Sequence, residues 1–175
     1  MTKMFDHIGS SEARAFIVER LSDDALLGRS GYTMRQSTYV LPYPPAQSAY
    51  ARDLVAAICA EDLPNRGVAA VQVNLYDIVL GFLDEQGMWE PLCEAERDSS
   101  RDELIMMLQD TISVSDVIRP AVEARIRESG CDIAFITGVG ETFPYVRTHT
   151  LLGEIETDKP VVLVFPGEYR QNADG

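Results

Sequence analysis

The sequence predicts an α/β fold in which a mostly parallel β-sheet carries helices on both faces. Two observations support this prediction. Short, continuous apolar segments rich in β-branched residues are typical of strands that are buried on both faces. Segments with apolar residues at helical spacing lie between them, and this alternation indicates parallel strands joined by helical crossovers.

The first part of the chain predicts two helices and the first strand. Ser10 or Ser11 is a candidate N-cap for the first helix, because a serine side chain can accept a hydrogen bond from a free backbone N–H. The segment 37–41 predicts the first strand, and we expect Pro42 to end it because proline cannot donate to a sheet ladder. The segment 47–61 has the apolar spacing of a helix.

A helical insertion is predicted between the second and third strands. The apolar segment 68–75 predicts the second strand. The helices expected after it are 75–86, a short piece from Trp89, one capped by Ser100 with Glu103 three residues on, and one capped by Ser113 or Ser115. In the third of these, Leu104, Met107 and Leu108 are expected to face inward. Because such an insertion is unusual in this fold class, we expect it to form a separate lobe or a cap.

The last two strands are predicted at 133–136 and 161–165. Both segments are continuously apolar, which favours strands buried in a parallel sheet. Between them, Tyr145, His149 and Leu152 are spaced at helical intervals, so we expect a helix that starts after the glycine turn. The three elements together predict a strand–helix–strand crossover unit.

Two polar turns follow these strands, and we expect them to lie side by side. Gly138 to Thr142 follows the third strand, and Pro166 to Tyr169 follows the fourth. The carboxyl ends of neighbouring parallel strands lie at one edge of the sheet, where open α/β sheets usually place their sites. This edge is therefore the predicted location of the functional site.

The Gly138-Val139-Gly140 turn has only part of a nucleotide-binding motif. A dinucleotide fingerprint needs a further glycine at position 143, which is Phe143, and normally follows the first strand. No glycine loop is followed by Lys and Ser or Thr, so the fold is Rossmann-like or P-loop-like without a Walker A sequence. These observations favour a tight turn, and a bound phosphate stays as the alternative.

The composition predicts one soluble domain spanning residues 1–175. Apolar residues make up 46% of the chain and charged residues 25%, and no stretch approaches the roughly 20 apolar residues of a membrane span. The N-terminus has no apolar signal-peptide core, so we expect a cytoplasmic protein without a membrane contact. The net charge of −13 argues against direct nucleic-acid binding, which needs a concentrated basic face.

No pattern for catalysis or metal binding is present in the sequence. Serines lack a GxSxG elbow, and neither the histidines nor the cysteines have zinc-ligand spacing. We expect Cys59, Cys93 and Cys131 to be small buried apolar residues. The acids Asp77, Glu141 and Glu168 would form a magnesium site only if the fold brought them together. We therefore expect no catalytic residue, no metal and no cofactor.

The late part of the chain carries the candidate partner-binding residues. Aromatic and arginine side chains dominate interface energetics. The candidates are Phe143, Tyr145, Arg147, His149 and Tyr169. For Arg147, a guanidinium that holds the carboxylate of Glu168 inside the fold is the competing interpretation.

Several motifs in this region together resemble the BrxB family of BREX bacteriophage-defence systems. The matching positions are the TGVG turn at Thr137 to Gly140, then Pro144, Tyr145, Arg147, His149, Leu151 and Leu152, and the PGEY strand end at Pro166 to Tyr169. The upstream sequences VNLYDIVLGFLDEQG and YVLPYPP are also similar to that family. The resemblance covers residues 12–169. Relatives usually continue past the PGEY turn with another apolar segment, whereas this chain ends in RQNADG, and we expect a sheet edge or partner surface to be missing there.

The resemblance implies a non-enzymatic adaptor in a defence complex. Its expected partner is a PglZ-type protein of alkaline-phosphatase-like fold, together with other BREX components, and no catalytic residue is carried over. Two other hypotheses stay open. A degenerate nucleotide-binding domain would sense a phosphate ligand at Gly138, and an acidic DNA mimic would show a regular array of surface carboxylates.

Overall fold

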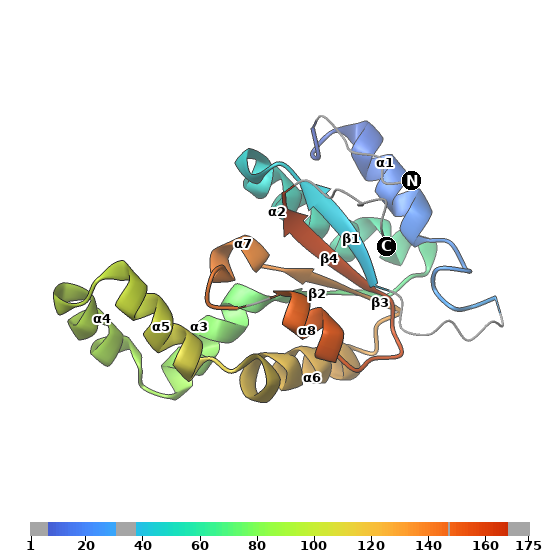
Figure 1. Ribbon diagram of the computed structural model, residues 1–175. Helices are drawn as coiled ribbons and strands as arrows, with labels where there is room; N and C mark the ends of the chain where they lie inside the picture. Colours follow the sequence, from blue (N-terminus) through green and yellow to red (C-terminus); the bar gives the residue numbers. More distant parts are fainter. Residues whose placement is uncertain (1–6, 31–37, 147, 168–175) are drawn as a thin grey trace, which may run out of the picture.

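The sheet has four parallel strands. A computed structural model of the protein describes residues 7–30, 38–146 and 148–167, with only the backbone of Thr148 and His149. The strands are β1 (Thr38–Tyr43), β2 (Ala70–Asn74), β3 (Ile133–Thr137) and β4 (Val161–Pro166), in the order β1-β4-β3-β2 (Figure 1). All three strand pairs are parallel. The predicted α/β fold with a parallel sheet is confirmed.

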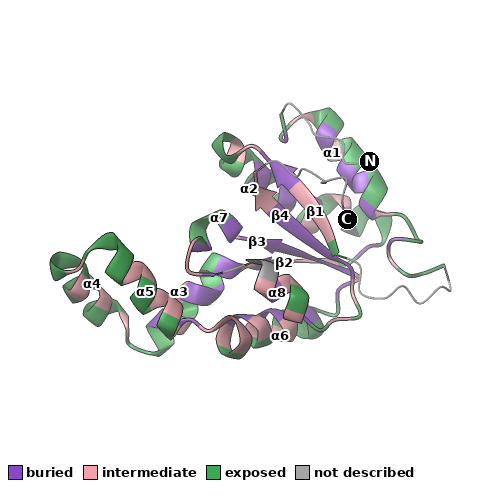
Figure 2. Ribbon diagram, viewed as in Figure 1, coloured by how far each residue is buried: buried purple, intermediate pink, exposed green. Residues whose placement is uncertain are grey.

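Helices cover both faces of the sheet. On one face lie α1 (Ser11–Leu21), α2 (Ser48–Ala57) and the π-helical turn η2 (Ile58–Asp62), and on the other lie α3 (Leu75–Glu85), α6 (Arg119–Ser129) and α8 (Thr148–Glu154) (Figure 1). Side chains of the central strand β3 alternate between two apolar cores: Ile133 and Phe135 pack with the first group of helices, Ala134 and Ile136 with the second. The whole of β3 is buried (Figure 2), which explains its continuous apolar sequence.

The remaining described elements are short or lie in the insertion. They are η1 (Pro45–Gln47), η3 (Pro64–Arg66), α4 (Trp89–Asp98), α5 (Arg101–Thr111), η4 (Val114–Ile118) and α7 (Val139–Thr142). Among the described residues, no helix is long and apolar enough to cross a bilayer.

Two predicted strand boundaries were wrong. Strand β1 continues through Pro42 to Tyr43 instead of ending at the proline. Because β1 is an edge strand, one side of its backbone has no partner strand within the described parts of the chain, and the missing N–H of Pro42 costs no ladder bond there. Strand β2 is shorter than the apolar segment suggested, because Leu75 already begins α3 with Asn74 as its N-cap.

The helix predicted between the last two strands is interrupted. Helix α7 has only four residues, Phe143 has extended backbone angles, the Phe143–Pro144 peptide bond is cis, and α8 starts at Thr148. Proline lacks the N–H that a helix interior needs, and it disfavours the helical region for the preceding residue. Tyr145 therefore lies in a turn and not on a helix.

Part of the insertion between β2 and β3 projects from the sheet, as the expectation of a separate lobe implied, whereas α3 and α6 of the same insertion pack on the sheet (Figure 1). We use "the arm" for residues 75–111, which contain α3, α4 and α5. Helices α4 and α5 project away from the sheet beyond α3, and neither contains a buried residue (Figures 1 and 2). The predicted capping box of Ser100 and Glu103 is present at the start of α5. However, the expectation that Met107 faces inward was wrong, since its side chain is exposed.

Candidate functional site

The two polar corners at the carboxyl ends of β3 and β4 lie side by side, as predicted. Strands β3 and β4 are direct neighbours in parallel register. A Cβ atom placed on Gly140 would lie 3.2 Å from Cγ of Pro166, so the backbone of one corner touches the side chain of the other. The fold thus brings the predicted site segments to one edge of the sheet.

Gly138 is the point where this corner packs against the start of α3. Its backbone is left-handed, with φ of +77°, and a Cβ there would overlap Oδ1 of Asn74 and lie 2.8 Å from the backbone nitrogen of Tyr76. The Tyr76 N–H donates to Asn74 Oδ1 at 3.0 Å and so caps α3. Thr142 Oγ1 donates to the Gly138 carbonyl at 3.0 Å and closes the turn. These contacts support the interpretation as a tight turn.

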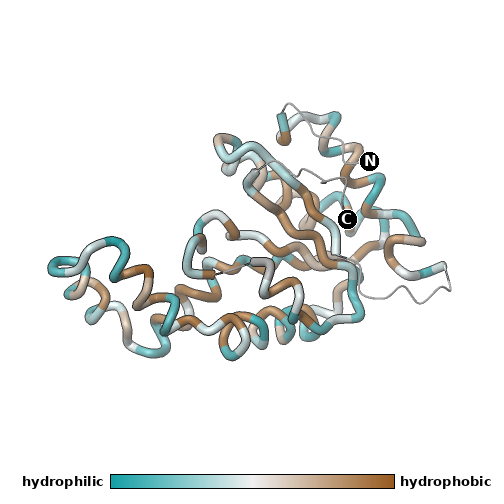
Figure 3. The backbone as a smooth tube through the Cα atoms, viewed as in Figure 1, coloured by the Kyte–Doolittle hydropathy of each residue, from teal (hydrophilic) through white to brown (hydrophobic). Residues whose placement is uncertain are grey.

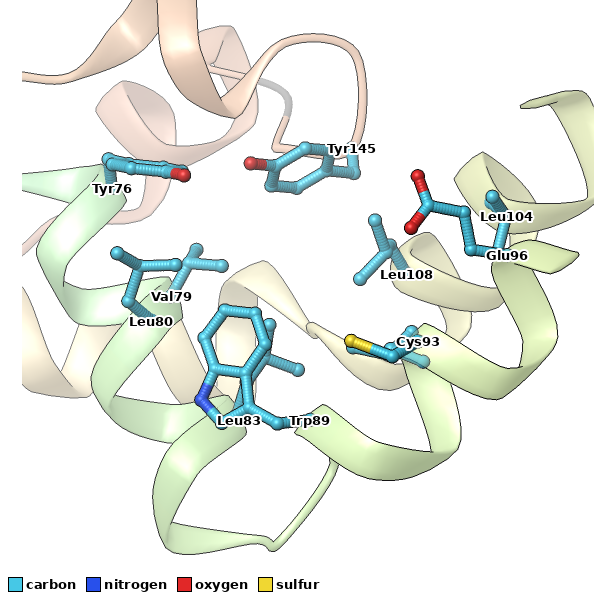
Figure 4. Close-up of a pocket in the computed structure, with 11 residues that line it drawn as sticks. Tyr76, Val79, Leu80, Leu83, Trp89, Cys93, Glu96, Leu104, Leu108 and Tyr145 are labelled. Atoms are coloured by element: carbon cyan, nitrogen blue, oxygen red, sulfur yellow. The ribbon is translucent and has the colours of Figure 1, made fainter.

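An apolar groove lies within the arm, between α3 on one side and α4 and α5 on the other, and the turn that follows α7 closes one end of it (Figure 4). Its volume is about 230 Å³. It is lined by Tyr76, Val79, Leu80 and Leu83 from α3, by Trp89, Leu92, Cys93 and Glu96 from α4, by Leu104 and Leu108 from α5, and by Tyr145 (Figure 4). In Figure 4, α3 forms one side of the groove, α4 and α5 form the other, and Tyr145 closes one end. Figure 3 shows that hydrophilic and hydrophobic segments alternate along the arm.

Tyr145 is held in the groove by polar contacts of its own turn. Its hydroxyl donates to the carbonyl oxygen of Glu141 at 2.9 Å, and the hydroxyl groups of Tyr145 and Tyr76 point toward one another (Figure 4). Partial burial raises the pKa of Tyr145, and the nearby Tyr76 and Glu141 raise it further. Gln109 Nε2 of α5 donates to the carbonyl oxygen of Pro144 at 3.1 Å, which connects the arm to this turn.

The structure places two of the five predicted partner-binding side chains. Tyr145 lines the groove, and Phe143, two residues before it, is 75% exposed. Arg147 and Tyr169 lie outside the described residues, as does Glu168 with the predicted Arg147–Glu168 clamp. His149 is in α8, but its side chain is not described.

Sequence reasoning missed most of the groove. Trp89 and Cys93 of α4 and Leu104 and Leu108 of α5 had been expected to belong to ordinary short helices. The signal that could have identified them is an apolar stripe at helical spacing within an insertion, which has no strand of its own to pack against. An exposed apolar stripe of this kind often marks a binding surface.

The expectation that all three cysteines are buried was wrong for Cys93, which is exposed on the arm. Cys131 is buried, and Cys59 is partly buried. Burial raises the pKa of Cys59 to about 12, and the neighbouring Cys131 adds to the effect. Since the thiolate is the reactive form, Cys59 is protected from thiol chemistry at neutral pH.

The groove offers apolar surface for contact with another molecule, and its lining is mostly apolar side chains. Within residues 7–30, 38–146 and 148–167, no group of three or more His, Cys, Asp or Glu could hold a metal ion. Asp77 and Glu141 are both exposed. A groove of this kind can bind the apolar side chains of another molecule by removing them from water.

The family model and the relatives that match this chain carry the same name. The family model described as "BREX protein BrxB" matches residues 71–174, which is more than half of the chain. A protein named BREX protein BrxB from Bacillus cereus (strain H3081.97) is 25% identical over 160 residues, covering 87% of this chain and 82% of that protein. Another of that name, from Escherichia coli O9:H4 (strain HS), is 22% identical over 159 residues, covering 87% of this chain and 76% of that protein. No solved structure matches the chain significantly.

Proposed function

Because the chain belongs to the BrxB family of BREX proteins, we propose that it acts in BREX phage defence as a non-enzymatic adaptor that binds a PglZ-type protein. The observation that carries the proposal is the family match, together with two relatives of the same name whose similarity extends over 87% of the chain. The PglZ-type partner and the cytoplasmic location are inferred from the resemblance and the composition.

The groove supports a role in binding another protein. Its lining includes one tryptophan and two tyrosines, and these residue types are enriched at the energetic centres of protein interfaces. Trp89 is 41% exposed and Tyr76 is 37% exposed, so their rings remain partly in contact with water. A partner that covers these rings removes apolar surface from water, which contributes a hydrophobic free energy of roughly 25 cal/mol per Å².

The packing of the glycine corner favours the adaptor over the phosphate-sensing alternative. On the side where a Cβ would stand, Gly138 faces Asn74 and the backbone of Tyr76, and Gly140 faces Pro166. A ligand that binds only the folded protein must raise its melting temperature. We expect a panel of nucleotides to leave the melting temperature unchanged, and a clear increase with one nucleotide would favour the sensor instead.

Co-purification tests the proposal directly. The tagged chain is expressed together with the other components of its native BREX operon and recovered on an affinity resin. We expect the PglZ-type protein to be retained in stoichiometric amounts, whereas an unrelated tagged protein of similar size and acidity retains none. A failure to retain any BREX component at micromolar concentrations would contradict the adaptor role.

A further inference from the structure

The groove is an apolar face that the described part of the chain leaves uncovered. The groove-lining residues of α4 recur at intervals of three and four residues, from Trp89 through Cys93 to Glu96, so they form one stripe along the helix. No residue of α4 or α5 is buried, although both helices carry apolar side chains toward the groove. An amphipathic helix pair of this kind obtains little stability from its own packing and offers a surface to a partner.

Exposed acidic residues lie on the two helices that carry most of the groove lining. On α3, Asp77 and Asp84 each directly follow a groove-lining residue, and on α4 the same is true of Glu90 and Glu94. Glu96 itself lines the groove, and Figure 4 shows its carboxylate near Leu104 and Leu108. Glu96 therefore places a carboxylate in the groove itself, whereas a residue that directly follows a lining residue points about 100° away from it around the helix, so the other acids add negative charge to these helices without lining the groove.

The charge of the arm is strongly one-sided. Residues 75–111 contain ten Asp and Glu and two Arg, a net charge of −8, whereas the whole chain carries −13. Glu90, Glu94 and Asp98 are spaced four residues apart on α4, so their carboxylates repel one another along one side of the helix. The net negative charge of the arm attracts a basic partner at long range.

We propose that the groove binds an amphipathic helix of a partner protein whose apolar stripe is flanked by lysine and arginine. This inference rests on the proposed adaptor function and names the kind of segment that docks. The leucine-size residues of the incoming helix enter the groove beside Trp89 and Tyr145, while its cations lie against the acids of α3 and α4. Helix-in-groove binding of this kind is a recurring mode of peptide recognition.

Other occupants fit the groove less well. Its volume of about 230 Å³ lies below the roughly 300–1,000 Å³ of typical small-molecule pockets. A second copy of the chain would bring another net charge of −13 toward an acidic surface. Nucleic acid would be repelled by the same carboxylates.

Trp89, the single tryptophan of the chain, reports on the groove by its fluorescence. We would titrate the purified chain with a helical peptide of about 18 residues, made of leucine, lysine and alanine, with the leucines on one face. We expect a shift of Trp89 emission to shorter wavelength and an affinity that falls at least about tenfold between about 50 mM and about 300 mM salt. A peptide with glutamate in place of lysine, and a scrambled lysine peptide whose leucines share no face, are expected to bind at least about tenfold more weakly.

A pair of charge-reversal variants tests the location of the site. Glu90→Lys/Glu96→Lys changes Glu96, which lines the groove, and Glu90, which directly follows the groove-lining Trp89, whereas Glu19→Lys/Glu128→Lys makes the same change in net charge on exposed positions of α1 and α6. We expect the first variant to bind the lysine peptide at least about tenfold more weakly, and the control to change its affinity less than about threefold. Circular dichroism spectra and melting temperatures verify that both variants fold.

Three outcomes would overturn the inference. The first is an unchanged Trp89 emission with the lysine peptide. The second is equal binding of the amphipathic and scrambled peptides, or an equal effect of the two charge reversals. The third is concentration-dependent dimerisation that itself shifts Trp89 emission, because the groove would then be taken by a second copy.

The peptide titration needs no BREX component, so it separates this inference from the proposed function. If the lysine peptide binds at Trp89 but no PglZ-type protein is retained by the wild-type chain, only the proposed function is contradicted. If the PglZ-type protein is retained equally by the wild type and by Glu90→Lys/Glu96→Lys, the adaptor role stands and the groove inference is wrong.

Discussion

Replacing Gly138 by alanine tests whether the corner after β3 is fixed by packing as well as by backbone angle. At φ of +77° an alanine is strained, which costs about 1–2 kcal/mol. Its Cβ would also overlap Oδ1 of Asn74 and lie 2.8 Å from the Tyr76 nitrogen, so the cap of α3 must move. Losing an N-cap costs about 0.5–2 kcal/mol. Together these terms predict a loss of about 1.5–4 kcal/mol in the free energy of unfolding.

Gly130 provides a matched control, because only its backbone angle is shared with Gly138. It ends α6 with φ of +61°, and a Cβ there would meet no atom within 4 Å. Gly130→Ala should therefore cost only the strain, about 1–2 kcal/mol. Urea denaturation measures both losses, provided that the slopes of the transitions agree.

Asn74→Gly isolates the side-chain part of the clash. Glycine is a nearly equivalent N-cap, so this change alone should cost a few tenths of a kcal/mol. In the double variant with Gly138→Ala the overlapping Oδ1 is gone, and we expect the double variant to be less destabilised than the sum of the two changes by about 1 kcal/mol. Equal losses for Gly138→Ala and Gly130→Ala, with additive effects in the double variant, would refute the packing argument.

Three further predictions concern the core, the arm and the thiols. Phe135 is completely buried in β3 whereas Phe143 is 75% exposed. In urea denaturation, Phe135→Ala should therefore lower the free energy of unfolding by about 3–5 kcal/mol, and Phe143→Ala by less than about 0.5 kcal/mol. Similar losses for the two variants would contradict the difference in burial between the two side chains. The hydrogen bonds that Glu103 accepts from the N-cap serine of α5 lower its pKa, so NMR titration should place it below the roughly 4.3 of a free glutamate. Because the pKa of Glu103 is lower in the folded state, these hydrogen bonds stabilise the folded protein at a pH above the unfolded-state pKa. This stabilisation is lost as the pH falls through the folded-state pKa. With a thiol reagent at pH about 8, the exposed Cys93 should react much faster than Cys59, whose pKa is raised to about 12, and Cys93→Ser should remove the fast phase; a fast phase that persists would contradict this assignment.

The location of the four strands could be predicted from the sequence, because a strand that is buried on both faces has a continuous apolar sequence. The segments at 133–136 and 161–165 became β3 and β4, and their parallel pairing puts Gly140 against Pro166 as expected. Boundaries were less certain wherever tertiary position decides them. Pro42 stays in a strand only because that strand lies at the sheet edge, which no local pattern reveals.

The groove could not be predicted because Tyr145, which closes one end (Figure 4), is distant in sequence from the helices that form the two sides, and because the angle between those helices is set by tertiary packing. Tyr145 was identified from its residue type, yet its place depends on Pro144, which separates α7 from α8, and on the bond between Gln109 and the Pro144 carbonyl. Leu104 and Leu108 of α5 looked like part of an ordinary core, and only a short helical piece was expected from Trp89. Helical spacing shows that a face is apolar, but it does not show whether another element of the same chain covers it.

Isothermal titration calorimetry of the purified chain against the purified PglZ-type protein of the same BREX system tests the central claim most directly. The account predicts saturable, one-to-one binding with a Kd of about 1 µM or tighter at about 100 mM salt, with a negative heat-capacity change from apolar burial. An absence of binding heat across several temperatures, with both proteins folded and at about 100 µM, would contradict the claim that this chain is an adaptor for that partner.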